Sequence, residues 1–436
     1  MRHSSTRSFL WLTGIVLALL AGTNASALDP WPAEPLSSAI NLTEIEGPGV
    51  NDFYNDLSGA VWNPVTRTLW VCRNGPGGSA SKLWAIVEDG SGGYEVDSRD
   101  GNRGEWTGFG DFEGVTQADF EEDVIYAIVE GEERIKEYDV STYGAAVLTN
   151  DWNTSSYLPL SGGSGAEGIT FVPDSCLAAA GFVDADGLPR VSGGGMGGLM
   201  FVAHQNGGNV FVFDLDRLAG GFTFVGEYGT GYSETAALEF DRSTGELYAW
   251  HDAGFDVLSV FDLASSEVLG ESRRELTALR RFSGPSSQNN EGIAVVSADD
   301  CFAGSRSLFM TVDDGGESSL LCYREFEDGC SVCVSVGVAD AAPWSNDRLD
   351  ALPNPFTNET AVSFLLRSPS DVCLGVFDLA GREVRSLHAS NRSTGRHTVI
   401  WDGRDRRGEK VGSGVYLMRL QANGRVVGRR KAIVLR

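Results

Sequence analysis

The sequence has no long apolar segment after its first twenty residues, which excludes a membrane-spanning helix in the rest of the chain. Lysine is scarce, and no long stretch shows the 3.6-residue apolar period of an amphipathic helix. A nucleophile elbow, a Walker loop, an H-E-x-x-H helix and a dinucleotide-binding fingerprint are also missing. The enzyme classes that these motifs mark have no support, and the abundant glycine (55 of 436 residues) favours an all-β chain with many turns.

The N-terminus has the pattern of a secretory signal peptide. Arg2 and Arg7 precede an apolar run over residues 9–20, and the small residues Ala25, Ser26 and Ala27 follow it. The run is about a dozen residues long, whereas a spanning helix needs about 20. We therefore predict that residues 1–27 are removed and that the mature protein is secreted or displayed at the cell surface, without a transmembrane segment.

The net charge of −26 is unevenly distributed. Residues 350–436 contain 15 basic and 8 acidic residues, a balance of +7, and the first 27 residues contribute +2. Residues 28–349 therefore carry −35, a charge that repels nucleic acids and anionic lipids. This acidic region suits a cationic ligand. Alternatively, its charges form a solvated surface that keeps an exported protein soluble.

Seven cysteines in an exported chain permit disulfides and leave at least one thiol unpaired. Cys330 and Cys333 form a C-x-x-C motif. A redox or zinc site would need a thioredoxin-like β-α-β context or a second ligand pair, and neither is visible. A local disulfide or free thiols are the favoured interpretation.

A repeat of about 55 residues is the most informative feature of the chain. Successive copies begin 55, 54, 69 and 55 residues apart, and the long interval contains a glycine-rich insertion at 193–198 that reads as an extended loop. Two further short strands with polar turns follow each beginning. The beginnings are LSGAVW (57–62), FEGVT (112–116), AEGITF (166–171), TAALEF (235–240) and NEGIAV (290–295).

A small antiparallel sheet of three or four strands cannot bury both of its faces alone. Radial stacking of such sheets gives a β-propeller, whose repeats have about this length. We predict a propeller over residues 28–342, with five blades favoured and six allowed if residues 28–50 and 330–345 together form another.

In a propeller, equivalent residues of the innermost strands form rings. One column of the repeat contains three glutamates, which would converge near one axis and repel each other unless a cation or hydrogen-bond donors compensate. Ca²⁺ is a suitable ion, although Gly and Glu could equally serve to pack the blades closely and to cap amides. The columns are Ser58, Glu113, Glu167, Ala236 and Glu291, and Asn74, Glu130, Gln205, Asp252 and Asp313.

These columns supply the predicted site. Glu113, Glu167, Glu291, Glu130, Asp252 and Asp313 are the candidate metal ligands, and Ser58, Asn74 and Gln205 are the candidate ligand-binding residues. His204 and His251 each precede a residue of the second column and are the candidate acid and base. Neighbouring residues of a strand point to opposite sides, which favours packing between blades for both histidines.

The repeat also carries a family resemblance. The openings above, with LEFDRSTGELYAWHD (238–252), resemble SdiA-regulated propellers and the related esterase-like phytase domains over residues 50–330. In the fourth repeat, Ala236 and Ala237 replace the polar residue and glycine of the other copies. This blade is therefore expected to contribute nothing polar at that position.

The C-terminal region has its own series of motifs. A polar linker (343–352) precedes PNPF (353–356), VFDLAGREV (376–384), WDG (401–403) and SGVYLMRL (413–420). Alternating strands with glycine turns predict an immunoglobulin-like β-sandwich over residues 353–436. In this order the motifs resemble the FlgD-type immunoglobulin-like domain and the type IX secretion sorting domains. The resemblance implies a module for sorting or surface attachment that contacts bacterial secretion or cell-surface machinery; a passive accessory domain is the alternative.

Two functions remain open. The first is an exported protein that binds a divalent cation or a small polar ligand in the central channel of the propeller. The second is a metal-dependent hydrolase of phosphate or carboxylate esters, which the phytase-like resemblance implies. The sequence favours binding over catalysis, because no catalytic signature is complete.

Overall fold

A computed structural model gives the structure of the chain. The predicted signal peptide and residues 331–349, which include Cys333 and most of the predicted linker, lie outside the described residues. The described residues are 28–45, 52–54, 56–75, 81–159, 165–252, 254–268, 271, 273–285, 289–301, 305–313, 315–330, 350–366, 370–378, 383–392, 395–405, 408, 410–422 and 425–436.

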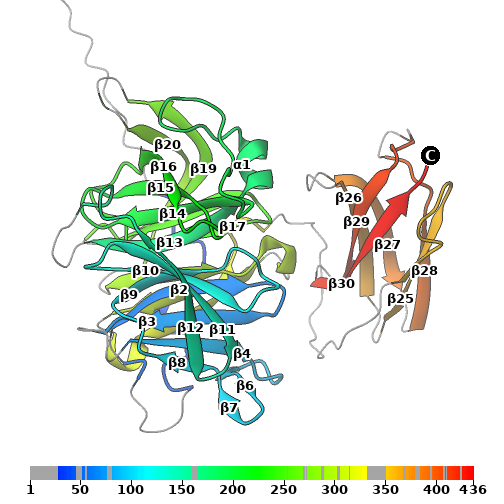
Figure 1. The fold of residues 1–436 in the computed structure, drawn as a ribbon. Helices are drawn as coiled ribbons and strands as arrows, with labels where there is room; N and C mark the ends of the chain where they lie inside the picture. The colour runs from blue at the N-terminus through cyan, green and yellow to red at the C-terminus, as the bar shows by residue number, and fades with distance from the viewer. Residues whose placement is uncertain are drawn as a thin grey trace, which may run out of the picture.

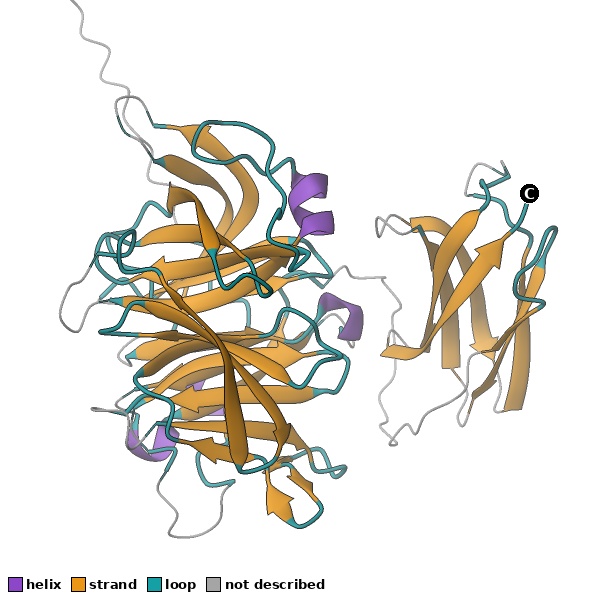
Figure 2. Cartoon of the chain, viewed as in Figure 1, coloured by secondary structure: helices purple, strands orange, loops and turns teal. Residues whose placement is uncertain are grey.

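The predicted all-β class is confirmed (Figure 2). In the described part of the chain, α1 (Asp174–Ala180) is the one α-helix, and no helix there is long and apolar enough to cross a membrane. The first sheet contains β2 (Leu57–Asn63), β3 (Thr68–Arg73), β4 (Lys82–Glu88), β5 (Tyr94–Val96) and β8 (Glu105–Thr107), beside a hairpin of β6 (Ser98–Arg99) and β7 (Asn102–Arg103). The second contains β9 (Phe112–Thr116), β10 (Val124–Val129), β11 (Arg134–Thr142) and β12 (Ala145–Asn153).

The next two repeats share one eight-stranded sheet, which nearly closes on itself because its two end strands, β13 and β17, contact each other. A short parallel pairing of β16 with β20 joins its halves. The third half-sheet is β13 (Ala166–Pro173), β14 (Gly198–His204), β15 (Asn209–Leu215) and β16 (Phe222–Gly229). The fourth is β17 (Ala237–Asp241), β18 (Glu246–His251), β19 (Val257–Glu267) and β20 (Arg274–Ser283).

The last sheet recruits a strand from the start of the described chain. It contains β21 (Asn290–Val295), β22 (Arg306–Val312) and β23 (Leu320–Phe326), and β1 (Ile40–Asn41) pairs with β23. Trp31 packs against Trp250 and Tyr323, which anchors the same segment. The described residues of 28–50 therefore complete the fifth sheet and do not form the sixth that the sequence allowed.

The first strands of the five repeats contact one another in a closed cycle, β2–β9–β13–β17–β21–β2, which we call the ring. Figure 1 labels β2, β9, β13 and β17. Each apolar core lies between two consecutive sheets. Val61 and Trp70 of the first sheet, for example, pack with Val115 and Ile125 of the second. Four further cores of the same kind continue around the cycle. Every sheet thus buries both faces against its neighbours, as the repeat requires.

The glycine-rich insertion of the third repeat is an anchored loop. Asp214 of β15 is buried, and its carboxylate accepts hydrogen bonds from Arg190, Ser192, and the amides of Gly193 and Gly194 at 2.7–3.0 Å. The same long interval between repeat beginnings also contains α1, which the sequence analysis did not predict. Four donors on one carboxylate account for a fixed path in a segment rich in glycine.

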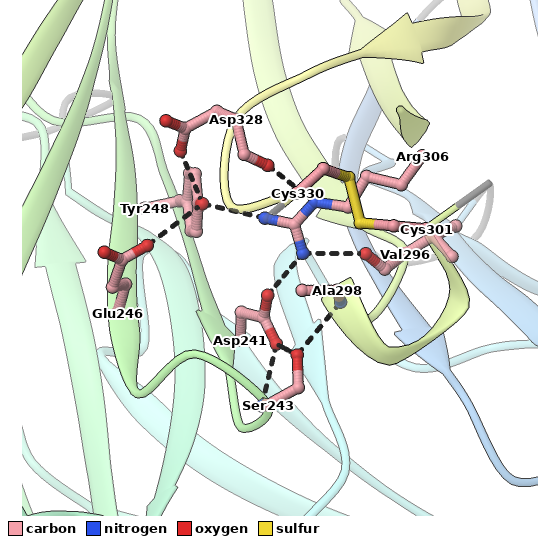
Figure 3. The surroundings of a disulfide bond; sticks show 10 residues. All are labelled: Asp241, Ser243, Glu246, Tyr248, Val296, Ala298, Cys301, Arg306, Asp328 and Cys330. Atoms are coloured by element: carbon pink, nitrogen blue, oxygen red, sulfur yellow. Dashed lines mark hydrogen bonds and ion pairs between the residues drawn. A yellow bond between two sulfur atoms is a disulfide. The ribbon is translucent and has the colours of Figure 1, made fainter. Parts of the chain in front are cut away.

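The disulfide differs from the local pairing favoured for Cys330. Cys330 bonds to Cys301, which is 29 residues earlier, and the Cα atoms lie 5.8 Å apart (Figure 3). The bond joins the turn after β23 to the turn after β21. Cys72, Cys176 and Cys322 are free thiols. The error arises because the pairing of cysteines depends on which turns the fold brings together.

The C-terminal domain is the predicted immunoglobulin-like sandwich. One sheet is β24 (Asp350–Leu352), β25 (Thr360–Leu366) and β28 (Gly395–Trp401). The other is β26 (Ser370–Phe377), β27 (Glu383–Arg392), β29 (Gly414–Ala422) and β30 (Arg425–Val434). Trp401 packs at its centre against Phe356 and Tyr416. Residues 350–352, which the sequence analysis assigned to the linker, form β24 and pair with β25.

Candidate functional site

All five strands of the ring begin at one end, which we call the acidic end. The second strand of each repeat is antiparallel to the first, so the residue after the second strand returns to this end. One backbone hydrogen bond of 2.9–3.0 Å repeats in four sheets and fixes the geometry: the amides of Asn74, Glu130, Gln205 and Asp313 donate to the carbonyls of Asp56, Asp111, Gly165 and Asn289. The two predicted columns therefore meet at one end of the ring.

The same hydrogen bond identifies a third column that the sequence analysis missed. It lies two residues before the first column, where strand alternation places side chains on the same face. Shifting the repeat alignment by two residues would have found it. Its members are Asp56, Asp111, Gly165, Glu234 and Asn289.

The ring is nearly closed at its waist. A Cβ added at Gly59, Gly114, Gly168 or Gly292 would come within 2.0–2.7 Å of the neighbouring ring strand, so glycine permits the close approach of the backbones. The cavity between the five strands has a volume of about 10 Å³, room for one water molecule. The predicted channel is therefore not open from end to end, and a ligand would bind at the acidic end.

The three glutamates of the first column do converge. Glu113 and Glu167 are buried, and burial together with the neighbouring carboxylates raises the pKa of each well above its usual range. Burial, followed by the charges of Asp313 and Asp252, raises the pKa of Glu291 to about 8. In the described part of the chain, no lysine or arginine pairs with these three. Each must bind a proton or an external cation near neutral pH.

The tightest cluster combines Asp111, Glu113 and Glu130. One carboxylate oxygen from each lies within 4.8 Å of the other two, close enough to share one ion. Asn74 donates through Nδ2 to both oxygens of Glu113 at 3.2 and 3.4 Å, while its Oδ1 is buried without a partner among the described residues. Rotation of this amide would turn an oxygen ligand toward the carboxylates. We call these four residues the carboxylate cluster.

A second group surrounds Glu291. Asn289 donates to Glu291 at 2.9 Å and to Asp313 at 3.3 Å, and Ser58 donates to the other oxygen of Glu291 at 3.5 Å. Asp252 is buried nearby, and its charge contributes to the raised pKa of Glu291. Like the carboxylate cluster, this group receives an amide donor, and a hydroxyl donor adds to it.

Two further buried glutamates of the acidic end were not predicted. Burial raises the pKa of Glu234 and of Glu133 to about 7. Both carboxylate oxygens of Glu234, and Oε2 of Glu133, have no hydrogen-bond partner in the described part of the chain. Glu130 accepts from the Gly165 amide at 2.8 Å, and a side chain at Gly165 would collide with it and with Glu133. Gly165 thus makes room for two carboxylates from the second sheet.

The remaining predicted residues lie outside this cluster. The amide of Gln205 takes its place in the repeated hydrogen bond, but Ala236 contributes nothing polar. His204 and His251 are fully buried, with both nitrogens of each ring in hydrogen bonds. Burial lowers the pKa of His251 to about 3, and its ring stacks on Tyr232 at 4.2 Å. Both have the geometry of packing residues.

Comparison with known proteins identifies the C-terminal domain. A family model described as the FlgD Ig-like domain matches residues 351–425, which confirms that part of the predicted resemblance. No curated protein matches the chain. Among solved structures, FlgD from P. aeruginosa is 24% identical, with a TM-score of 0.16, over 17% of this chain and 61% of its own. The chain therefore spans less than two thirds of that protein.

Two other solved structures match much more of the chain at low similarity. One is a chain of a mitotic checkpoint complex, 12% identical with a TM-score of 0.34, over 74% of this chain and 99% of that one. The other is a protein of unknown function from Desulfotomaculum acetoxidans, 10% identical with a TM-score of 0.31, over 87% and 89%.

Proposed function

We propose that residues 28–330 form a five-bladed β-propeller that binds a divalent cation, with Ca²⁺ as the first choice, at its acidic end. The observation that carries this proposal is the carboxylate cluster, where three carboxylates approach one another without a basic partner in the described chain. Ca²⁺ takes six to eight oxygen ligands from carboxylates, amides and water. Asp111, Glu113, Glu130 and Asn74 offer such a donor set.

A small organic cation is a poorer fit for this cluster. An ammonium group needs space and hydrogen-bond acceptors on one accessible face, whereas Glu113 is buried and the ring below it is closed by glycine. A hydrated divalent ion needs less room than an organic ammonium group, and it compensates two negative charges where the ammonium group compensates one. The unpartnered carboxylates of Glu234 and Glu133 add negative potential around the same end.

We also propose that the chain is exported and that its C-terminal domain sorts or attaches it at the cell surface. The predicted signal peptide and the FlgD Ig-like domain support this proposal, and the Cys301–Cys330 disulfide is typical of an oxidising compartment. N-terminal sequencing of the protein from the culture medium or envelope fraction should begin at Leu28. Retention of the protein in the cytoplasm with residues 1–27 intact would contradict export.

The binding proposal is tested by calorimetric titration with CaCl₂ after treatment with a chelator. We expect saturable binding near pH 7, with release of protons because ionisation of the raised carboxyls accompanies binding. The triple variant Asp111→Asn, Glu113→Gln, Glu130→Gln should abolish it. The matched control Glu95→Gln, Glu121→Gln, Glu267→Gln removes three exposed carboxylates and should bind as the parent does. Absence of binding by the parent, or full binding by the first triple variant, would overturn the proposal.

Ester hydrolysis is the second candidate, favoured by one observation: Glu291, with a pKa of about 8, is a protonated acid close to several ionisable carboxylates. A general acid beside a bound ion can protonate a leaving group. Turnover of p-nitrophenyl phosphate or acetate with CaCl₂ present, lost in Glu291→Gln, would support catalysis. Calcium binding without turnover of either ester would leave binding as the function.

A further inference from the structure

A hollow of about 450 Å³ lies at the seam of the eight-stranded sheet, where β16 pairs with β20. Arg273 and Glu275 form one wall, and Tyr232 and Ser233 form another, with the backbone of Gly231 between them. None of these residues belongs to the carboxylate cluster. The volume is in the range of small-molecule sites.

The first wall is a fixed array of planar polar groups. Arg273 Nε donates to Glu271 at 2.5 Å, and Nη1 donates to Oδ1 of Asn209 at 3.3 Å and to Oε2 of Glu275 at 3.4 Å. These bonds hold the guanidinium in place and leave Nη2 for a ligand. Asn209 in turn donates to Glu227 at 2.5 Å. The Arg273 and Glu275 side chains are 31% and 33% exposed, so each retains hydrogen-bonding capacity toward the hollow. A guanidinium supplies paired donors and a carboxylate supplies paired acceptors.

The second wall has hydroxyl groups that the protein leaves unused. Among the described residues, none bonds to the side-chain hydroxyl of Tyr232 or of Ser233. The Tyr232 ring is held in place, because it stacks on His251 at 4.2 Å and meets the edge of Phe255 at 5.1 Å. Both residues line the hollow, so their hydroxyls are available to a ligand there.

The charges of the hollow select the ligand. Glu271, Glu275 and Glu227 surround Arg273, and Arg281 approaches Gly231. An anion would meet these carboxylates and the net charge of −35 of residues 28–349, while a cation would meet the two guanidinium groups. A neutral molecule with adjacent hydroxyls satisfies both groups at once, since each hydroxyl accepts from the guanidinium and donates to the carboxylate. We propose that this hollow binds a neutral, hydroxyl-rich ligand of the size of a mono- or disaccharide.

The test uses the purified chain and a panel of neutral sugars: glucose, galactose, mannose, N-acetylglucosamine, maltose and cellobiose. Saturation-transfer NMR should detect binding of at least one sugar, and calorimetry should give its affinity. Arg273→Ala and Glu275→Ala should each weaken that affinity by at least about tenfold. Glu267→Ala removes an exposed carboxylate from the neighbouring strand β19 and should leave the affinity unchanged.

Ser233→Trp gives a test that does not alter the charged wall. The exposed serine lines the hollow, so an indole there should block the sugar while thermal unfolding stays close to that of the parent. Silence of the whole panel in the saturation-transfer experiment would overturn the proposal. Binding that survives both Glu275→Ala and Ser233→Trp would overturn it equally, because the sugar would then bind elsewhere.

Discussion

Buried carboxylates have basic partners at one end of the ring and none among the described residues at the other. At the end where the ring strands finish, Asp241 is buried and pairs with buried Arg306. Arg306 also donates to the Tyr248 hydroxyl at 2.8 Å and to the carbonyls of Val296 and Asp328 at 3.0 and 2.9 Å (Figure 3). We call this the paired end. At the acidic end, Glu113 and its neighbours have no basic partner in the described chain.

This difference distinguishes buried carboxylates that form internal ion pairs from buried carboxylates that can bind an external cation. A buried carboxylate with a buried guanidinium is complete, and removal of either group leaves the other uncompensated. A buried carboxylate among other carboxylates is incomplete, and takes up protons or a cation. Substitutions at the two ends should therefore change stability with opposite signs, which the following predictions test.

The largest effect is expected at the paired end. Arg306→Met removes the partner of Asp241, and loss of one member of a buried ion pair destabilises by about 3–5 kcal/mol. Urea unfolding of the variant measures the change. Arg67→Met is the control, since its ion pair with Glu88 is 40% exposed on both sides and should contribute less than about 1 kcal/mol. Equal losses in the two variants would remove the distinction between buried and surface pairs.

The disulfide beside the paired end should rank next. Cys301→Ala with Cys330→Ala opens a link across 29 residues, for which chain entropy predicts a loss of about 3.6 kcal/mol. Thermal unfolding with and without dithiothreitol checks this value. Reductant should destabilise the parent and leave the double variant unchanged. A parent that is insensitive to reductant throughout unfolding would contradict the predicted contribution.

The next largest loss of stability is expected for substitutions at the waist, where the glycines of the ring strands lie between its two ends. A Cβ at Gly114 would lie 2.6 Å from the Glu167 carbonyl oxygen, so Gly114→Ala should force the ring strands apart and cost about 1–3 kcal/mol. Gly221→Ala is the control, because nothing lies within 4 Å of its Cβ position. Urea unfolding compares the two variants. A Gly114→Ala protein as stable as the control would show that the ring can expand.

The smallest effect, with the opposite sign, is expected at the acidic end. The pKa of Glu291 is about 8 in the fold and about 4.3 in an unfolded chain. Between about pH 4.3 and pH 8, this carboxyl is therefore protonated in the folded protein and ionised in the unfolded chain. Its contribution to stability is therefore full below about pH 4 and falls as the pH rises to 8.

Glu291→Gln should flatten this dependence and stabilise the chelator-treated protein at pH 8 by roughly 1 kcal/mol or more. Unfolding free energies of parent and variant between pH 5 and 9 measure the difference. Added CaCl₂ should reduce the advantage of the variant. A difference between the two proteins that is constant across this pH range would refute the assignment of the proton to Glu291.

The repeat predicted much of this arrangement because two simple rules act together. A fixed period aligns equivalent strands, and strand alternation then fixes which side chains share a face. This was sufficient to bring Glu113, Glu167 and Glu291 together. It did not give Asp111 or Glu234, because the shared Glu-Gly beginnings defined the alignment and the third column lies before them.

Other features depend on contacts that no local pattern encodes. The pairing of Cys301 with Cys330 requires two turns to meet at the paired end, and the parallel pairing of β16 with β20 joins two repeats at their outer strands. The hollow beside Arg273 exists only because of that second contact. The closed waist was also hidden, since the glycines indicate close approach but not how little space remains.

The pairing of β1 with β23 gives the domain an order of assembly. Ile40 leaves the ribosome well before its partner Cys322, which follows 282 residues later. The fifth sheet cannot be completed until nearly the whole body is available, so the emerging chain has no early closed form. Under the export proposed above, this delay would keep the chain open until it has crossed the membrane, because β1 has no partner before β23 is available.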